Sequence, residues 1–188
     1  GIEYSRAVIF FDFGEVGTGA TYYWDDVVFG AGGLQPLDLP VTFDDPEVDY
    51  ALSDFNGTAT SVGADPTGAD NSVGVTVKGD GAEFFAGTVV AKDFGTFASA
   101  IPFTDTDTVM SVRVFSPVAG AIVKLKVENA ADGNLAAEVD VPTTVANAWE
   151  TLNFDFGSVG IDTGIEYSRA VIFFDFGEVG TGATYYWD

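Results

Sequence analysis

The chain has 188 residues, 29 of them acidic and seven basic, and a formal net charge of −22. It contains no cysteine and no histidine, which excludes disulfides, zinc sites of the Cys/His type and histidine-based catalysis. The negative charge argues against nucleic acid and anionic membranes as partners. No apolar run reaches the roughly 18 residues that a membrane span needs.

Glycine and phenylalanine are abundant, at 23 and 17 residues, and 47% of the residues are hydrophobic. No stretch of ten or more residues keeps the apolar stripe of an amphipathic helix. This composition predicts short strands and tight turns around one hydrophobic core.

The segment GIEYSRAVIFFDFGEVGTGATYYWD stands at residues 1–25 and again at 164–188. The two copies begin at positions 1 and 164, which indicates a repeat with a period of 163 residues. After the first copy come DVVFG and then AGGLQPLDLP, which combines Gly-Gly with two prolines as linkers do. We predict that residues 1–30 are closing strands of a preceding repeat, 31–40 a linker, and 41–188 a β-sandwich lacking its last few residues.

Alternating apolar and polar residues predict the strands of this sandwich. The runs lie at residues 72–78, 108–115, 122–129, 151–156, 169–176 and 183–188. One face of the first four runs carries Val73, Val75 and Val77; Met110, Val112 and Val114; Val123, Leu125 and Val127; and Leu152, Phe154 and Phe156. The turn segments SPVAG, NAADGN and VGTG separate the runs as in an antiparallel two-sheet β-sandwich.

Catalysis without histidine would require a pair of carboxylates. Glu128 and Glu138 lie on outward faces of neighbouring predicted strands, where solvated charge is the ordinary role. The loop at residues 65–72 is rich in Asp, Asn, Gly and Pro, a composition that fits an ion site but is commoner in simple turns. No phosphate-binding glycine loop or nucleophile elbow is present. We predict no enzymatic activity.

Three stretches carry a family resemblance. They are TFDDPEVDYALSDFNG, KVENAADGNLAAEVDVPTTVANAWETLNFDF and AVIFFDFGEVGTGATYYWD. Together they resemble the jelly-roll β-sandwich of carbohydrate-binding modules that occur, often in tandem, in secreted and cell-surface proteins of bacteria. The resemblance covers Val41 to Asp188 and implies an extracellular or cell-surface location, whereas it leaves the ligand undefined.

In similar modules, an acidic residue of the first strand and an Asp pair before the last strand hold a structural calcium ion. The resemblance implies that Asp44 or Asp45 would act with Asp25 and Asp26, and Asp188 is the second-copy equivalent of Asp25. Ca²⁺ takes several oxygen ligands, and adjacent aspartates are costly without a cation. The alternative is that these carboxylates are solvated turn and edge charges.

Similar modules also carry a tryptophan for sugar stacking in the loop that corresponds to GAEFFAGT. This chain has Phe84 and Phe85 there, and phenylalanine stacks on sugars less well. Trp149 is a further ligand-binding candidate because simple alternation exposes it. Packing in the core or at its rim is the favoured alternative for Trp149, since a β-bulge would turn it inward.

Two functions remain open. The favoured one is a non-catalytic tandem repeat of an extracellular bacterial surface fibre or adhesin, in which neighbouring copies join head to tail. Either copy of the repeated segment could close the central sandwich, and the other could complete a neighbour by strand complementation. The alternative is a carbohydrate-binding module that gains avidity for a polysaccharide from its tandem copies.

Overall fold

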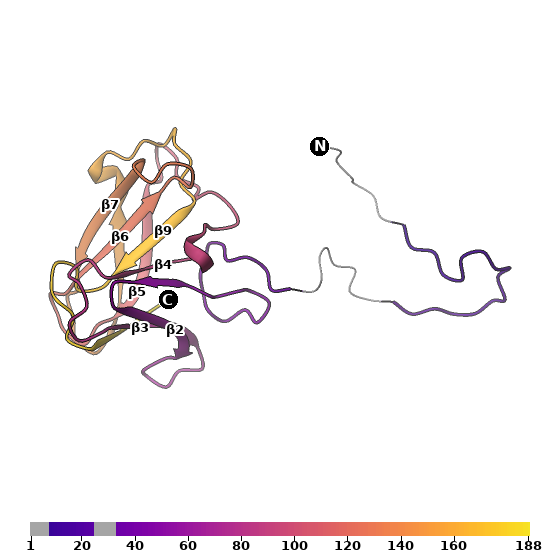
Figure 1. Cartoon of the computed structure of the whole chain (residues 1–188), viewed down its shortest axis with the longest axis horizontal. Coiled ribbons are helices and arrows are strands. Elements are labelled where there is room, and N and C mark those ends of the chain that lie inside the picture. Colours follow the sequence, from indigo (N-terminus) through magenta and orange to yellow (C-terminus); the bar gives the residue numbers. More distant parts are fainter. Residues whose placement is uncertain (1–7, 25–32) are drawn as a thin grey trace. The chain divides into compact units, whose positions relative to one another are not determined.

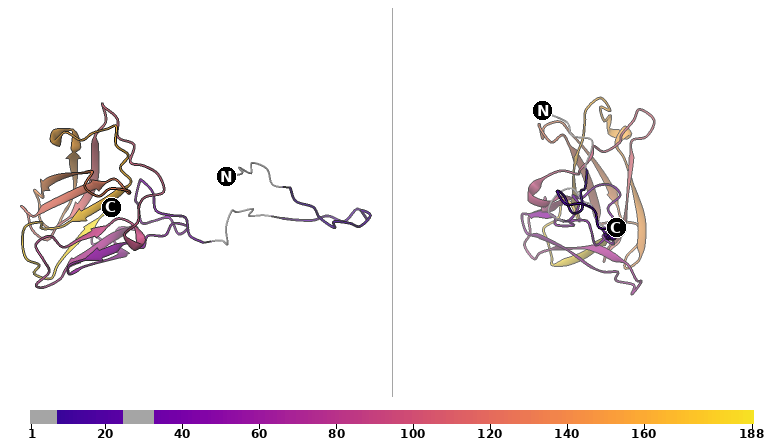
Figure 2. Two further views of the ribbon diagram at one scale, coloured as in Figure 1. Left: turned by 45° about the horizontal axis from the view of Figure 1, so that its top comes forward. Right: turned by 90° about the vertical axis from the view of Figure 1, so that its right-hand side faces the viewer.

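The computed structural model describes residues 8–24 and 33–188. The chain divides into two compact units, Gly1–Gly33 and Leu34–Asp188. The second unit is a sandwich of two β-sheets (Figures 1 and 2). None of the helices in the described residues is both long and apolar enough to cross a membrane.

Each sheet has five strands, and all strand pairs are antiparallel. The first sheet has the order β1 (Ser53–Phe55), β4 (Gly87–Val89), β9 (Arg169–Phe173), β6 (Ile122–Glu128) and β7 (Ala136–Pro142). The second has the order β2 (Thr58–Ala64), β3 (Ser72–Lys78), β10 (Ala183–Trp187), β5 (Val109–Phe115) and β8 (Trp149–Asp155). Two short 3₁₀ helices are η1 (Lys92–Phe94) and η2 (Phe156–Val159). The predicted all-β, antiparallel two-sheet sandwich is confirmed.

The repeated segment at 164–188 supplies the middle strand of both sheets. Its first strand, β9, lies between β4 and β6, and its second strand, β10, lies between β3 and β5. We call residues 171–187 the second copy and residues 8–24 the first copy. The sandwich is therefore closed by the second copy.

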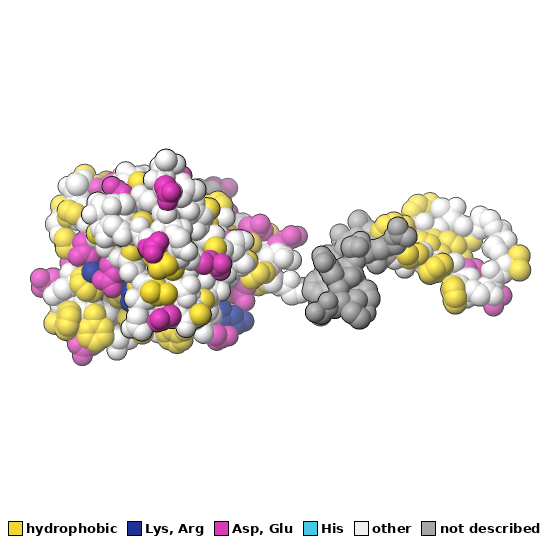
Figure 3. Space-filling view, turned by 90° about the horizontal axis from the view of Figure 1, so that it is seen from above, with side chains coloured by type: hydrophobic (Ala, Val, Ile, Leu, Met, Phe, Trp, Pro, Cys, Tyr) yellow, Lys and Arg dark blue, Asp and Glu magenta, His cyan; other side chains and the backbone are white. Residues whose placement is uncertain are grey.

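The described part of the first unit contains no β-strand. Its backbone turns at Asp12, whose carbonyl oxygen accepts a hydrogen bond from the Glu15 amide at 3.1 Å. The Tyr22 hydroxyl donates to the Asp12 carboxylate at 2.8 Å, and the ring of Phe11 stacks on that of Tyr22 with centroids 5.2 Å apart. Hydrophobic side chains, yellow in Figure 3, nevertheless remain at the surface of the first copy.

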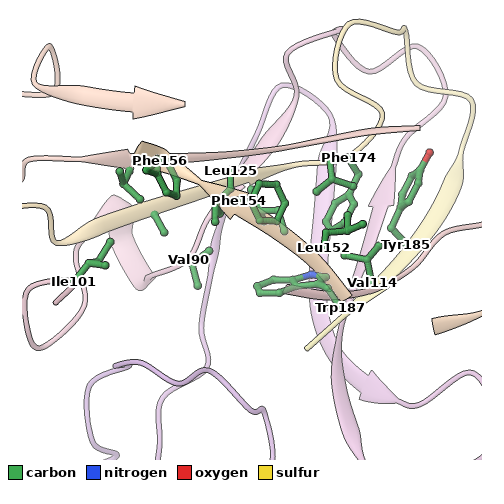
Figure 4. Close-up of a cluster of buried hydrophobic side chains, with 14 of the residues drawn as sticks. Val90, Ile101, Val114, Leu125, Leu152, Phe154, Phe156, Phe174, Tyr185 and Trp187 are labelled. Atoms are coloured by element: carbon green, nitrogen blue, oxygen red, sulfur yellow. The ribbon is translucent and has the colours of Figure 1, made fainter. Parts of the chain in front are cut away.

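The main core fills the space between the sheets (Figure 4). The predicted inward residues of β6 and β8 are all buried there: Val123, Leu125, Val127, Leu152 and Phe154, with Phe156 following in η2. Burying one such side chain contributes about 1.5–3 kcal/mol. Leu37 is buried in the same core, so part of the predicted linker at 31–40 lies with the sandwich unit.

β3 differs from the simplest expectation for an alternating strand. Thr76 pairs with the buried Tyr185 of β10, so Thr76 and Lys78 face the core, while Val75 and Val77 lie on the opposite, partly exposed face. Polar groups can face the core when they find hydrogen-bond partners there, as Thr76 and Lys78 do. Lys78, only 2% exposed, donates its ammonium to the carbonyl oxygen of Asp175 at 2.8 Å, and burial lowers its pKa.

Candidate functional site

A groove of about 440 Å³ lies on the outer face of the β1-β4-β9-β6-β7 sheet. Successive residues of a strand point to opposite faces, so the residues that line it alternate with the core residues of β9 and β6. We call it the outer-face groove. Its lining residues are Phe55, Phe85, Val89, Phe94, Lys124, Lys126, Glu128, Glu138, Arg169, Val171, Phe173 and Phe176.

One part of the groove is aromatic. Phe173 at the end of β9 meets Phe55 of β1 and Phe176 edge to face, with ring centroids 5.8 and 5.5 Å apart. Gly87 of β4 makes room for Phe173, because a Cβ at that position would lie 2.6 Å from the ring. The Phe173 side chain packs with Val89, Ala91 and Val171 in a small cluster separate from the main core.

The other part of the groove is charged. β6 presents Lys124, Lys126 and Glu128 at alternate positions. The Lys124 ammonium lies 2.9 Å from Glu138 of β7, and the Glu128 carboxylate lies 2.7 Å from Lys126 and 3.1 Å from Arg169 of β9. Cross-strand pairing places Glu128 directly opposite Arg169, whereas Lys124 reaches Glu138 diagonally because it stands opposite Asp140. Lys126 and Glu128 are two residues apart on the same face of β6.

These contacts favour the ionised forms of Glu128 and Lys124. Burial raises the pKa of Glu128, but the hydrogen bonds from Lys126 and Arg169 outweigh it, and the pKa lies below its usual range. Burial lowers the pKa of Lys124, but hydrogen bonds to Glu138 and Asp140 leave it raised overall. The Lys124 ammonium also lies 4.2 Å from the centroid of the Phe176 ring, a cation–π contact.

The groove thus sets apolar ring surface beside fixed donors and acceptors. Three of its lining residues, Lys124, Lys126 and Arg169, are basic in a chain that has only seven basic residues. Such a surface suits a ligand with both CH faces and many hydroxyl groups, because rings pack against the former and charged groups hydrogen-bond the latter.

The predicted ligand-binding residues fall in different places. Phe85 lines the groove, whereas Phe84 lies beside it with its ring 4.9 Å from that of Phe85. Trp149 begins β8, in the other sheet. Its indole nitrogen donates to Asp65 at 3.2 Å, and the Arg113 guanidinium lies 4.2 Å from its ring centroid. The structure does not bring Trp149 together with the two phenylalanines.

The loop at residues 65–72 is organised around Asp65. One carboxylate oxygen of Asp65 accepts hydrogen bonds from the Thr67 amide at 2.7 Å and the Thr67 hydroxyl at 2.6 Å. The other lies 3.7 Å from the Arg113 guanidinium. The Thr67 hydrogen bonds lower the pKa of Asp65 despite its burial. These are the contacts of a turn that supports Trp149.

Sequence reasoning did not single out most of the groove. Glu128 and Glu138 were expected to be solvated, but the Glu128 side chain is only 13% exposed and sits between two cations. The charged part of the groove could have been predicted from Lys124, Lys126 and Glu128, which alternate along one strand, and from Glu138 on the next strand. No comparable signal marks Phe173, because its neighbour Phe174 is equally apolar and packs in the core.

The predicted calcium ligands Asp25 and Asp26 lie outside the described residues. Asp44 accepts a hydrogen bond from the Ser72 amide at 2.8 Å, Asp45 accepts one from the Glu47 amide at 2.9 Å, and Asp188 lies 3.3 Å from Arg113. Within residues 8–24 and 33–188, no three acidic side chains gather into a cation site. Asp44, Asp45 and Asp188 therefore do not form a calcium site by themselves.

The two-sheet antiparallel sandwich defines the class as an all-β module with a groove on the outer face of one sheet. The family 11 carbohydrate-binding module from Clostridium thermocellum, in complex with a β-1,3-1,4-mixed-linked tetrasaccharide, superposes with a TM-score of 0.52 and 15% identity, over 85% of this chain and 94% of that one. The CBM22-1 xylan-binding domain from Paenibacillus barcinonensis gives 0.47 and 19%, over 85% and 94%.

The chain thus has a β-sandwich fold similar to that of carbohydrate-binding modules. A further solved structure, the family 30 module of a cellulosomal cellulase of Clostridium thermocellum, gives a TM-score of 0.45 and 9% identity, over 69% of this chain and 79% of that one. No family model and no curated protein matches the sequence.

Proposed function

We propose that the Leu34–Asp188 unit is a non-catalytic carbohydrate-binding module and that a polysaccharide chain lies in the outer-face groove. The observation that carries the proposal is the row of phenylalanine rings beside ionised side chains on one sheet face. The fold similarity to a module whose structure contains a tetrasaccharide supports it.

In this proposal the aromatic and the charged part of the groove make different contacts with the polysaccharide. Phe85 and Phe176 provide apolar surface for the CH faces of sugar rings, and the buried Phe173 supports Phe176 by an edge-to-face contact. Glu128 accepts hydrogen bonds from sugar hydroxyls, and Lys126 and Arg169 donate to them. Because ion pairs already hold these three side chains, little side-chain entropy is lost when the ligand binds.

Replacement of Phe176 by alanine tests the proposal. We expect mixed-linked β-glucan or xylan to bind the wild-type chain and to bind Phe176→Ala at least about tenfold more weakly, a loss of about 1.4 kcal/mol. Phe84→Ala is the matched control, because Phe84 is exposed and lies outside the groove. Isothermal titration calorimetry measures the glycan affinity of the wild-type chain and of both variants. Equal affinity of wild type and Phe176→Ala, or no binding to any glycan of a neutral and acidic panel, would contradict the proposal.

A second candidate function is a repeating unit of an extracellular bacterial surface fibre or adhesin. The identical segments at 1–25 and 164–188 favour it, because tandem copies of one module can join head to tail. In this function neighbouring copies of the repeat are the partners, and polysaccharide binding becomes secondary. The self-association measurements described below test the joint that it requires.

Structural calcium is a separate proposal for the carboxylates of Asp25, Asp26, Asp44, Asp45 and Asp188. Calcium at Asp188 would replace its ion pair with Arg113. We expect CaCl₂ added to chelator-treated protein to raise the thermal unfolding midpoint, because an ion that binds only the folded state stabilises it by mass action. Differential scanning calorimetry measures the midpoint, with MgCl₂ as the control. No shift at millimolar calcium would rule the site out.

A further inference from the structure

The two copies of one sequence have opposite surroundings. In the second copy the large hydrophobic side chains except Val179 are buried or half-buried, and in the first copy the same side chains are exposed. Tyr185 and Trp187 are 1% and 4% exposed, whereas their equivalents Tyr22 and Trp24 are 45% and 62% exposed. Leaving such side chains in water forgoes about 1.5–3 kcal/mol each. A run of exposed apolar residues of this kind marks an interaction surface.

The second copy occupies a closely fitted position between the other strands. The Trp187 indole nitrogen donates to the buried Thr76 hydroxyl at 3.0 Å, and a Cβ at Gly74 would lie 2.6 Å from the indole. The Phe174 and Tyr185 rings stack with centroids 5.0 Å apart. We call this position, between β4 and β6 in one sheet and between β3 and β5 in the other, the β9–β10 seat.

The turn between β9 and β10 is fitted as closely. The Gly180 amide donates to the Ala82 carbonyl at 2.8 Å, and a Cβ at Gly180 would lie 2.8 Å from the Ala82 side chain. At the equivalent Gly17 of the first copy, an added Cβ would have nothing within 4 Å. The first copy therefore carries glycines suited to a seat that it does not occupy in its own unit.

We infer that the first copy is a donor segment that occupies the β9–β10 seat in the sandwich of a second copy of this chain. Sequence identity fixes the occupant, because every seat contact made by the second copy can be made by the first. Each chain then carries one donor and one seat. Exchange joins chains head to tail, in an open series unless the rotation between neighbours closes a ring.

Paired tryptophan variants of the full chain test the inference. Trp187→Ala weakens the resident second copy and leaves the donor intact. We expect Trp187→Ala, refolded at increasing concentration, to shift from monomer to multiples of the chain mass in size-exclusion chromatography with light scattering. The Trp24→Ala/Trp187→Ala double variant should stay monomeric, and Trp24→Ala alone should unfold at the same temperature as wild type. Equal behaviour of Trp187→Ala and the double variant, including failure of both to fold, would overturn the inference.

A disulfide trap provides a second readout that does not weaken the seat. Thr184 of β10 stands opposite Val77 of β3, and Thr21 is its first-copy equivalent. Because the chain has no cysteine, Thr21→Cys/Val77→Cys introduces the only thiols. We expect oxidation to give a ladder of linked chains on a non-reducing gel, whereas Thr21→Cys alone stops at dimers. A double variant without linked products longer than dimers would contradict the inference. Polysaccharide binding does not enter either measurement, so either proposal can fail alone.

Discussion

At the scale of residues, the sandwich keeps several ionisable groups out of water by giving each a partner of opposite charge or a carbonyl. Glu128 is the best-enclosed carboxylate of the outer-face groove and lies between Lys126 and Arg169. A partly buried carboxylate that loses such partners is left with its desolvation cost. Glu128 therefore couples the stability of the sheet to the geometry of the proposed binding surface.

Glu128 predicts a pH dependence of stability. Its pKa in the folded chain lies below the ordinary value of 4.5, so its stabilising contribution is fully present above pH 4.5 and is lost as the pH falls through the folded-state pKa. At pH 7 we expect Glu128→Gln to lose roughly 1–3 kcal/mol of unfolding free energy. The difference in unfolding free energy between wild type and Glu128→Gln should become smaller as the pH is lowered. Urea titrations at several pH values measure this difference. A gap that does not change with pH would show that the ionised carboxylate is not the cause.

At the scale of elements, alternation predicted six of the ten described strands, namely β3, β5, β6, β8, β9 and β10, and the buried face of several of them. The inward residues of β5, β6 and β8 follow directly from the sequence, because a polar residue separates each pair of apolar ones. β3 does not, since Thr76 and Lys78 face inward only because β10 brings an indole nitrogen and the β9–β10 turn brings carbonyl oxygens. Partners that come from about a hundred residues away leave no local pattern.

The candidate groove was predictable only in part, for the same reason. Phe85 was identified from its loop, but Phe55, Phe173 and Phe176 meet only when β1, β4 and β9 pair. The position of Phe173 depends further on Gly87, which leaves room for its ring. The sequence shows the glycine, but it does not show that Phe173 lies beside it. Simple alternation predicts that Trp149 is exposed. In the structure the Arg113 guanidinium lies over its ring, and its indole nitrogen donates a hydrogen bond to Asp65.

The turn glycines give a matched test at the element scale. Gly180→Val places side-chain atoms against Ala82, and we expect a loss of about 1–3 kcal/mol of unfolding free energy from overpacking. Gly17→Val introduces the same change in the identical sequence of the first copy, where nothing lies nearby. Its monomer should be as stable as wild type in chemical denaturation. A similar loss for both variants would mean that the first copy is already packed within its own chain.

At the scale of the whole molecule, the two proposals support each other without depending on each other. Val171, Phe173 and Phe176 of the outer-face groove belong to the second copy, and the first copy carries the same residue types at Val8, Phe10 and Phe13. A sandwich completed by a donor therefore has the same groove. Chains joined in series would present a row of such grooves, and linked sites bind a polymeric ligand with avidity.

The proposed function requires that a glycan binds in the outer-face groove. The most direct test is an NMR titration of the isotope-labelled chain with a mixed-linked β-glucan tetrasaccharide, following the backbone amides. We predict progressive shifts at β6, β9 and the segment that reaches Phe176, with β8 and Trp149 unchanged. Shifts confined to β8 and the 65–72 loop, or no shifts with this or a xylan oligosaccharide at millimolar concentration, would contradict the assignment of the groove.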